Sequence, residues 1–386
     1  MYLNNYQKIF CVTIFYSFLY YISSTYMYTR HDPNLLATGY DTGRYLNLSN
    51  FFAGRVGVAG ENSSWHLYFT YTLFITILEK LNLIKYYVEV QYLIFYVSSI
   101  LFYKSLKNFN FSNTTTFLST IFIVCNPFIV FWIHVLNHAG ITISLFMISF
   151  YFLSKYDCGK LFKIFFFIFI FLTLKVDGKV FFTIFTMLFY KFYLIEQKKP
   201  ISNLLILISF FIIYFIYLSK FAVTLASFSD IYFQTDLIKN NFNFIIIDEA
   251  VMKTYNKCLI NEFNSLRNHF CALLDNPIYS MKVFITKFII LLTWINAKLS
   301  FKYNFFAIGM MFFLYFGLFL DLYKNRFTRF KFFLISAYLL TIVIVLPYLL
   351  RGDQKQVFYG MLFITPLCFS GYEILFKYFK KKATQK

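Results

Sequence analysis

The sequence predicts an all-α polytopic membrane protein. Of its 386 residues, 59% are hydrophobic and 14% are charged, whereas soluble globular domains contain about 25% charged residues. Several windows approach or exceed the roughly 18 consecutive apolar residues with which a helix crosses a bilayer. Basic residues mostly lie between these windows, as they do in loops that set membrane topology. We therefore expect about ten transmembrane helices, with further helices lying at the membrane surface.

The expected spans follow the apolar windows along the chain. The first window lacks a small-residue cleavage site, so we expect a retained signal anchor rather than a signal peptide that is removed. The spans are expected at residues 8–28, 86–103, 116–132, 139–153, 161–174, 180–195, 201–222, 303–322, 332–350 and 357–376.

Two other apolar segments are expected to lie at the membrane surface. Segment 67–83 is short and rich in Thr and Tyr, and segment 280–299 is interrupted by lysines. Both are typical of juxtamembrane helices. The chain then divides into an N-terminal membrane module (1–222, with a first external loop at 29–85), an external loop (223–302) and a C-terminal membrane module (303–386).

Short basic loops orient the predicted spans. With ten spans and both termini in the cytoplasm, the loops at 104–107, 155–163, 198–199 and 324–331 fall on the cytoplasmic side with the C-terminal tail, as the positive-inside rule requires. The loops at 29–85, 223–302 and 351–356 then share the external face. We expect a multi-pass protein of the bacterial inner (plasma) membrane whose active site faces the external, periplasmic side.

The net charge of +19 does not indicate nucleic acid as a partner. Phe, Tyr, Ile, Asn and Lys are enriched together, as codon bias in an AT-rich genome would produce, and few basic residues form a run. The C-terminal lysines are the exception, and we expect them to contact anionic headgroups among the membrane lipids.

Residues 40–45 are the strongest candidate site. Asp41 and Arg44 lie just beyond the first span, and Arg44 would follow one turn after Asp41 if the stretch is helical. The guanidinium could then orient the carboxylate and keep it ionised at neutral pH. Asp41 could accept a proton from a hydroxyl, hold a cation, or be an ordinary solvated loop residue.

Other ionisable and aromatic residues lie at span ends on the same predicted face. Ionisable groups next to apolar spans are costly and therefore candidates for function, although each could also be solvated in the headgroup layer. The further candidates are Asp32, Tyr45, His138, Lys175, Asp177 and Arg351.

No metal, nucleotide or dinucleotide signature accompanies these candidates. The sequence has no P-loop, GxGxxG, HExxH or pair of CxxC motifs. His134 and His138 stand four apart and could face one way, and without a carboxylate nearby we favour hydrogen bonding over a metal site. Cys258 and Cys271 share the long polar loop and could form a disulfide in an oxidising compartment, with the free and bonded states both open.

The order of these features resembles the GT-C superfamily of integral-membrane glycosyltransferases. The branch in question is similar to the protein mannosyltransferases and the aminoarabinose transferase of lipid A. Those proteins carry a D-x-x-x-Y setting in the loop after their first span, which Asp41 and Tyr45 match here. A juxtamembrane helix ending near Leu83, Gln91 in the next span, and Asn126-Pro127 with Trp132 follow in a similar order. Residues 351–366, with Tyr359, resemble the basic and Tyr-rich last external loop of the family, which makes Tyr359 a further site candidate. Family members often have an acidic residue where this chain has Asn137-His138.

The resemblance implies transfer of a sugar from a polyprenyl-phosphate-linked donor to a lipid, lipid-linked glycan or protein acceptor, with inversion. Asp41 would then be the general base, and Arg44, Arg351 and Lys175 would bind the donor phosphate. No cofactor is certain. A divalent cation stays open, and the missing second carboxylate counts against it.

Two other classes remain as alternatives. An O-antigen-type polysaccharide polymerase would use arginines in the long loop, where only Arg267 is present. A polytopic transporter or flippase would favour internal repeats and Gly- or Pro-broken spans, and we find no repeat.

Overall fold

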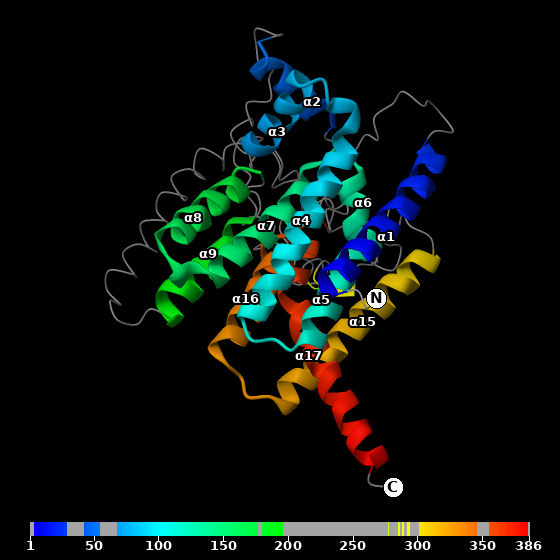
Figure 1. Cartoon of the computed structure of the whole chain (residues 1–386), viewed down its shortest axis with the longest axis vertical. Coiled ribbons are helices and arrows are strands. Elements are labelled where there is room, and N and C mark those ends of the chain that lie inside the picture. The colour runs from blue at the N-terminus through cyan, green and yellow to red at the C-terminus, as the bar shows by residue number, and fades with distance from the viewer. Residues whose placement is uncertain are drawn as a thin grey trace. The chain divides into compact units, whose positions relative to one another are not determined.

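The computed structural model is helical throughout the regular elements that it describes (Figure 1). The described residues are 4–28, 42–54, 68–176, 180–195, 301–345 and 355–384, with Pro277, Ile285, Phe288, Leu292 and Thr293. The chain forms two compact units. The first unit comprises residues 1–187, 316–338 and 358–386, and the second comprises 188–315 and 339–357.

The first unit opens with a long helix, two short helices and a second long helix. These are α1(Asn5–Tyr28), α2(Thr42–Phe52), α3(Phe69–Lys80) and α4(Tyr87–Asn108), with the 3₁₀ turn η2(Ile84–Tyr86) before α4. Asn82 and Asn110 follow α3 and α4 with φ of 56° and 62°. Asparagine tolerates this left-handed conformation, which lets the chain turn back onto the last carbonyls of each helix. The predicted surface helix 67–83 therefore corresponds to α3.

Side-chain caps divide the middle of the chain. Its helices are α5(Asn113–Val124), α6(Pro127–His134), α7(His138–Ser154), the 3₁₀ turn η3(Tyr156–Cys158) and α8(Lys160–Leu174). The Asn126 side chain accepts from the backbone N–H of Phe128 at 3.0 Å, and Pro127 occupies the first turn, where its missing N–H costs nothing. The axes of α5 and α6 consequently differ by 49°. The segment predicted as one span, 116–132, is a bent pair of helices.

The remaining described helices come from both units. They are α9(Phe181–Phe189), the π-helical segment η5(Tyr190–Ile195), α15(Phe301–Lys324), α16(Arg329–Val345) and α17(Lys355–Thr384). Every predicted span except 201–222, which lies outside the described residues, coincides with a helix or with the bent pair. The surface helix predicted at 280–299 also falls almost wholly outside them.

The length and composition of some helices, and their exposed apolar side chains, indicate a membrane protein. Among the described residues, two helical segments are long and apolar enough to cross a membrane, Asn304–Lys324 and Phe358–Thr384, and the bent pair makes three if it counts as one span. Large apolar side chains face outward on α15, where Phe305 and Phe312 are each 70% exposed. Such side chains in water would favour association, whereas lipid solvates them. The number of ten spans stays a prediction.

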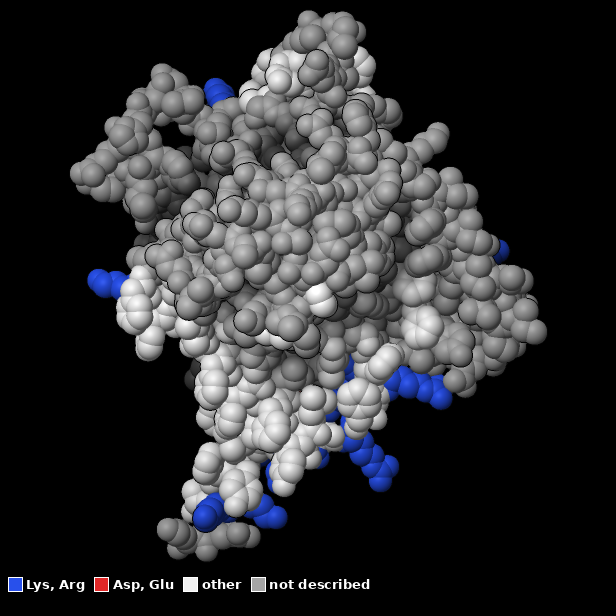
Figure 2. Space-filling model, turned by 180° about the vertical axis from the view of Figure 1, so that it is seen from behind, with Lys and Arg blue, Asp and Glu red and all other residues white. Residues whose placement is uncertain are grey.

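The basic loops of the first unit gather at one end. The Asn108 side chain donates to Ser154 Oγ at 2.9 Å, which joins the end of α4 to the end of α7. Phe109 stacks on Phe330 with ring centroids 4.5 Å apart, which adds the start of α16. This "basic end" carries Lys104, Lys107, Lys155, Lys160, Lys163, Lys324, Arg326, Arg329, Lys331, Lys377, Lys380, Lys381 and Lys382. On the face that Figure 2 displays, most of the Lys and Arg side chains drawn in blue lie in its lower part.

The first and the last described helices, α1 and α17, both reach the basic end. The Asn5 side chain donates to the Tyr103 hydroxyl at 3.1 Å, so α1 starts beside the last turns of α4. Glu373, in the C-terminal half of α17, contacts the start of α5. Loops 104–107, 155–163 and 324–331 and the described part of the C-terminal tail therefore share one end, as the topology prediction requires. Loop 198–199 lies outside the described residues.

Candidate functional site

Four ring side chains meet at the opposite end of the first unit. The Tyr45 hydroxyl and His138 Nδ1 form a hydrogen bond of 2.5 Å between α2 and α7, and both residues are buried. The Tyr68 ring lies 5.1 Å from the imidazole, and the Tyr71 ring lies 4.8 Å from the Tyr45 ring. We call these four residues the Tyr45 cluster. Two sequence-predicted site residues, 93 positions apart, are therefore in direct contact.

The local sequence positions Tyr45 and His138. On α2, Tyr45, Leu48 and Ser49 are buried at a spacing of three and four residues, which is one helical face. On α7, the Asn137 side chain accepts from the Ala139 N–H at 3.0 Å, so the helix begins at His138. His138 is therefore the first residue of α7, and from there its imidazole reaches Tyr45 on α2.

A layer of hydroxyl groups joins α2 to α3. Ser49 Oγ donates to Glu79 Oε2 at 2.7 Å, and Thr76 Oγ1 donates to Ser49 Oγ at 3.3 Å. Hydrogen bonds to an ionised carboxylate are among the stronger ones in proteins. They fix the pair of short helices that follows Asp41 in the sequence.

Lys175 reaches this end through its backbone. Its carbonyl accepts from the Thr70 N–H at 3.1 Å, and the next residue, Val176, belongs to the same apolar core as Tyr45 and Tyr71. The Lys175 ammonium lies 5.7 Å from the centre of the Phe171 ring. Partial burial lowers the pKa of Lys175 from its ordinary value. The structure therefore brings the Lys175 segment to the cluster and places the ammonium beside Phe171.

The hydroxyl of Tyr71 is the notable polar group of the cluster. The side chain is fully buried, and the hydroxyl has no hydrogen-bond partner among the described residues. Burial raises its pKa well above 10.0, so Tyr71 is a neutral phenol at physiological pH and can act as a donor. A buried donor of this kind ordinarily finds a partner.

Gln91 and Tyr87 support the cluster from α4. Gln91 Nε2 donates to the Ile133 carbonyl at 2.7 Å, and the Tyr87 hydroxyl donates to the His134 carbonyl at 3.2 Å. Both acceptors belong to the last turn of α6, whose carbonyls lack partners within the helix. The polar residue that the sequence placed early in the second span thus holds the α6–α7 junction.

His134 and His138 do not share a helical face. His134 ends α6, and the extended residues Val135 and Asn137 separate it from α7. The four-residue spacing therefore does not place the two imidazoles on one helical face. Among the described residues, no group of three or more His, Cys, Asp or Glu side chains could hold a metal ion.

Tyr359 lies away from the cluster. It is buried on α17 against Phe146, with ring centroids 5.7 Å apart. Phe146 follows His138 by eight positions on α7, which is about 12 Å along a helix. The structure therefore does not bring Tyr359 to the Tyr45 cluster.

Other predicted candidates have no described side chain. Arg44 lies within α2, which begins at Thr42, and its side chain is outside the described atoms, so its pairing with Asp41 stays a prediction. Six more candidates lie outside the described residues: Asp32, Asp41, Asp177, Cys258, Cys271 and Arg351.

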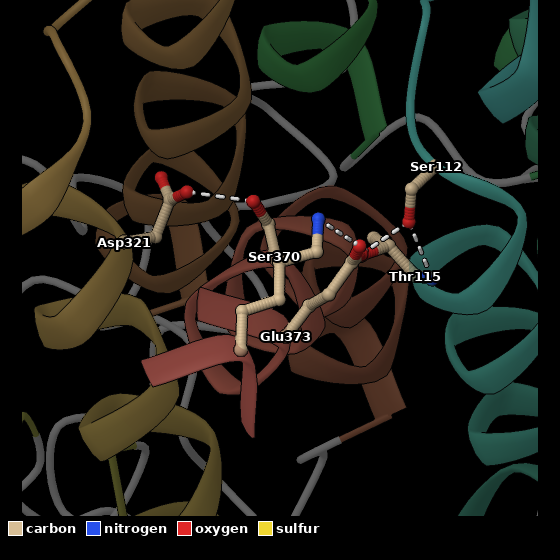
Figure 3. A network of polar contacts seen from close by, with 6 residues as sticks. Ser112, Thr115, Asp321, Ser370 and Glu373 are labelled. Carbon is tan, nitrogen blue, oxygen red and sulfur yellow. Dashed lines mark hydrogen bonds and ion pairs between the residues drawn. The ribbon is translucent and has the colours of Figure 1, made fainter. Parts of the chain in front are cut away.

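The sequence interpretation missed a polar network at the basic end (Figure 3). Asp321 on α15 is fully buried, accepts from Ser370 Oγ at 2.8 Å and pairs with Lys331 Nζ at 2.5 Å. One turn further along α17, Glu373 accepts from Thr115 Oγ1 at 2.7 Å and from the Ser112 hydroxyl. The available signal was an acidic residue inside each of two apolar windows, which is rare enough to indicate a buried role.

Comparison of the chain with protein-family models, curated proteins and solved structures finds no match.

Proposed function

We propose that this chain is a membrane glycosyltransferase of the GT-C type. In this proposal a sugar passes from a polyprenyl-phosphate-linked donor to a lipid, glycan or protein acceptor on the non-cytoplasmic face of the bacterial inner membrane. Asp41 removes the proton from the acceptor hydroxyl, which attacks the anomeric carbon with inversion as the lipid phosphate departs. Arg44, Arg351 and Lys175 would balance the charge that develops on that phosphate.

One observation supports the proposal most. The side chain of Tyr45, on the helix that follows Asp41 in the sequence, is hydrogen-bonded to His138, and α3 is hydrogen-bonded to the backbone of Lys175. These contacts between segments that the sequence predicted to share a site lie at the end opposite the basic loops, which supports the proposal. A catalytic base needs such a rigid support, because displacement by about 1 Å can cost a hundredfold in rate.

The described residues favour neither alternative class. A polymerase would work through residues 223–302, which lie almost entirely outside the described part. A transporter would favour an inverted repeat, and we find no repeat in the sequence.

Asp41→Asn tests the proposal directly. The amide cannot accept the hydroxyl proton, so we expect sugar transfer from a polyprenyl-phosphate donor to fall by about 10²–10⁴-fold, with insertion and thermal unfolding unchanged. Asp157→Asn is the matched control, since Asp157 is an exposed aspartate at the basic end. Full transfer by Asp41→Asn in reconstituted vesicles would remove the assignment of Asp41 as the base.

A further inference from the structure

The end of α17 presents a surface of exposed lysines and aromatic rings. From Phe376 to Thr384 every residue is exposed, and the helix continues past the contacts that Glu373 makes with α5. Helical spacing places Phe376 beside Lys380 and Phe379 beside Lys382, so aromatic and basic side chains alternate around the helix. Figure 2 shows basic side chains around this projecting end.

Neighbouring loops of the first unit extend the same surface. Lys324, Arg326 and Arg329 are exposed at the α15–α16 connection, with Tyr323 71% and Phe327 61% exposed beside them. The Asp321–Ser370 hydrogen bond holds this connection against α17. Basic and aromatic side chains therefore alternate around one end of the unit.

Internal contacts fix the direction of the helix. Glu373 accepts from Thr115 on α5 and pairs with Lys377 Nζ at 2.7 Å. Two residues before Glu373, Gly371 lets the backbone of α17 approach that of α15 closely at Gly317. The last two turns of α17 thus project from a rigid anchor, and the surface exists before any partner arrives.

We propose that this surface, α17 from Phe376 to Thr384 with the α15–α16 connection, binds anionic phospholipid headgroups of the bilayer that holds the chain. Charge complementarity accounts for the lysines, because phosphate-bearing headgroups attract basic segments beside a span. The position of the aromatic rings favours lipid over other polyanions. They end a helix that is long and apolar enough to cross a membrane, and aromatic side chains are enriched at the boundary between acyl chains and headgroups.

The test compares lipid retention in nanodiscs made from phosphatidylcholine mixed with phosphatidylglycerol. Phosphatidylglycerol should be enriched around the full-length protein over its share in the mixture. The variant K380Q/K381Q/K382Q keeps the Lys377–Glu373 pair and should lower that enrichment by about fivefold or more at low ionic strength. Added salt should weaken the enrichment in the unaltered protein.

The matched control is K80Q/K85Q, which removes two exposed lysines at the opposite end of the unit and should leave the enrichment unchanged. Equal enrichment in the triple variant and the unaltered protein would overturn the proposal. So would lysine-dependent binding of an RNA oligonucleotide by the detergent-solubilised protein at physiological salt, since that outcome would assign the surface to a different polyanion.

Discussion

At the scale of single residues, the Tyr45–His138 hydrogen bond is the contact on which the candidate site depends. It is buried, it joins helices far apart in the sequence, and it lies on the helix that follows Asp41. A hydrogen bond in such a place contributes modestly when made and costs much more when one partner is removed.

Tyr45→Phe isolates this contact. The substitution keeps the ring and removes the hydroxyl from His138 Nδ1, so we expect a loss of about 1–3 kcal/mol in the free energy of unfolding. If Tyr45 positions the helix behind Asp41, kcat for sugar transfer should fall while KM for the donor changes little. Thermal unfolding in detergent and transfer kinetics check the two parts.

Tyr86→Phe provides the comparison, because the Tyr86 side chain is 46% exposed. Tyr86→Phe should change neither the free energy of unfolding nor kcat. If Tyr45→Phe is as stable as Tyr86→Phe, the Tyr45 hydroxyl has no structural role.

Sequence reasoning at this scale found residue types and missed partners. It selected Tyr45, His138 and Lys175 from their place at span ends, and the structure gathers their segments. It did not find Asp321 or Glu373, because the partners of an acidic residue inside an apolar window are not visible in that window. Ser112 and Glu373 are 261 positions apart, and no local pattern encodes such a pair.

At the scale of elements, the crossing of α15 and α17 leaves no room for a Cβ at either of its glycines. A Cβ on Gly371 would lie 2.0 Å from the Gly317 carbonyl oxygen, and one on Gly317 would lie 2.6 Å from the Cys368 carbonyl oxygen. Backbone atoms cannot move aside as side chains do. Small residues at such a crossing let two helices pack closely inside a membrane.

Gly317→Ala should therefore force the two helices apart. Overpacking of this kind costs about 1–3 kcal/mol, and the loss should lie at the upper end because the clash is with backbone. Gly309→Ala on the same helix is the control, since its Cβ would meet no described atom within 4 Å. Alanine at position 309 should leave the protein equally stable or stabilise it by up to about 1 kcal/mol. Equal unfolding temperatures for the two variants would contradict the crossing.

The positions of the helices could be predicted from the apolar windows, whereas their bends and exact ends could not. The window 116–132 is continuous in hydrophobicity, and the 49° change of direction comes from a two-residue signal, Asn126-Pro127, that hydropathy does not weigh. The same limit affected His134 and His138. Their spacing fits one helical face, and the cap formed by Asn137 divides them between two helices.

At the scale of the whole molecule, the described residues of the first unit have two chemically different ends. One carries the described basic loops, the start of α1 and the end of α17, and the other carries the Tyr45 cluster. The order of the spans together with the positive-inside rule predicted that these loops share one side. It could be predicted because topology depends on the order of charges along the chain, whereas the pairing within each end depends on packing.

Cys158 tests which side of the membrane the basic end faces. It is an exposed free thiol in the α7–α8 connection, within loop 155–163. In a variant whose only thiol is Cys158, a membrane-impermeant maleimide should react only after the membrane is permeabilised, because short basic loops are retained in the cytoplasm. A single-thiol variant carrying Lys85→Cys, at the opposite end, should react in intact cells. Labelling of Cys158 in intact cells would invert the orientation and place the Tyr45 cluster in the cytoplasm, where a periplasmic sugar transfer could not take place.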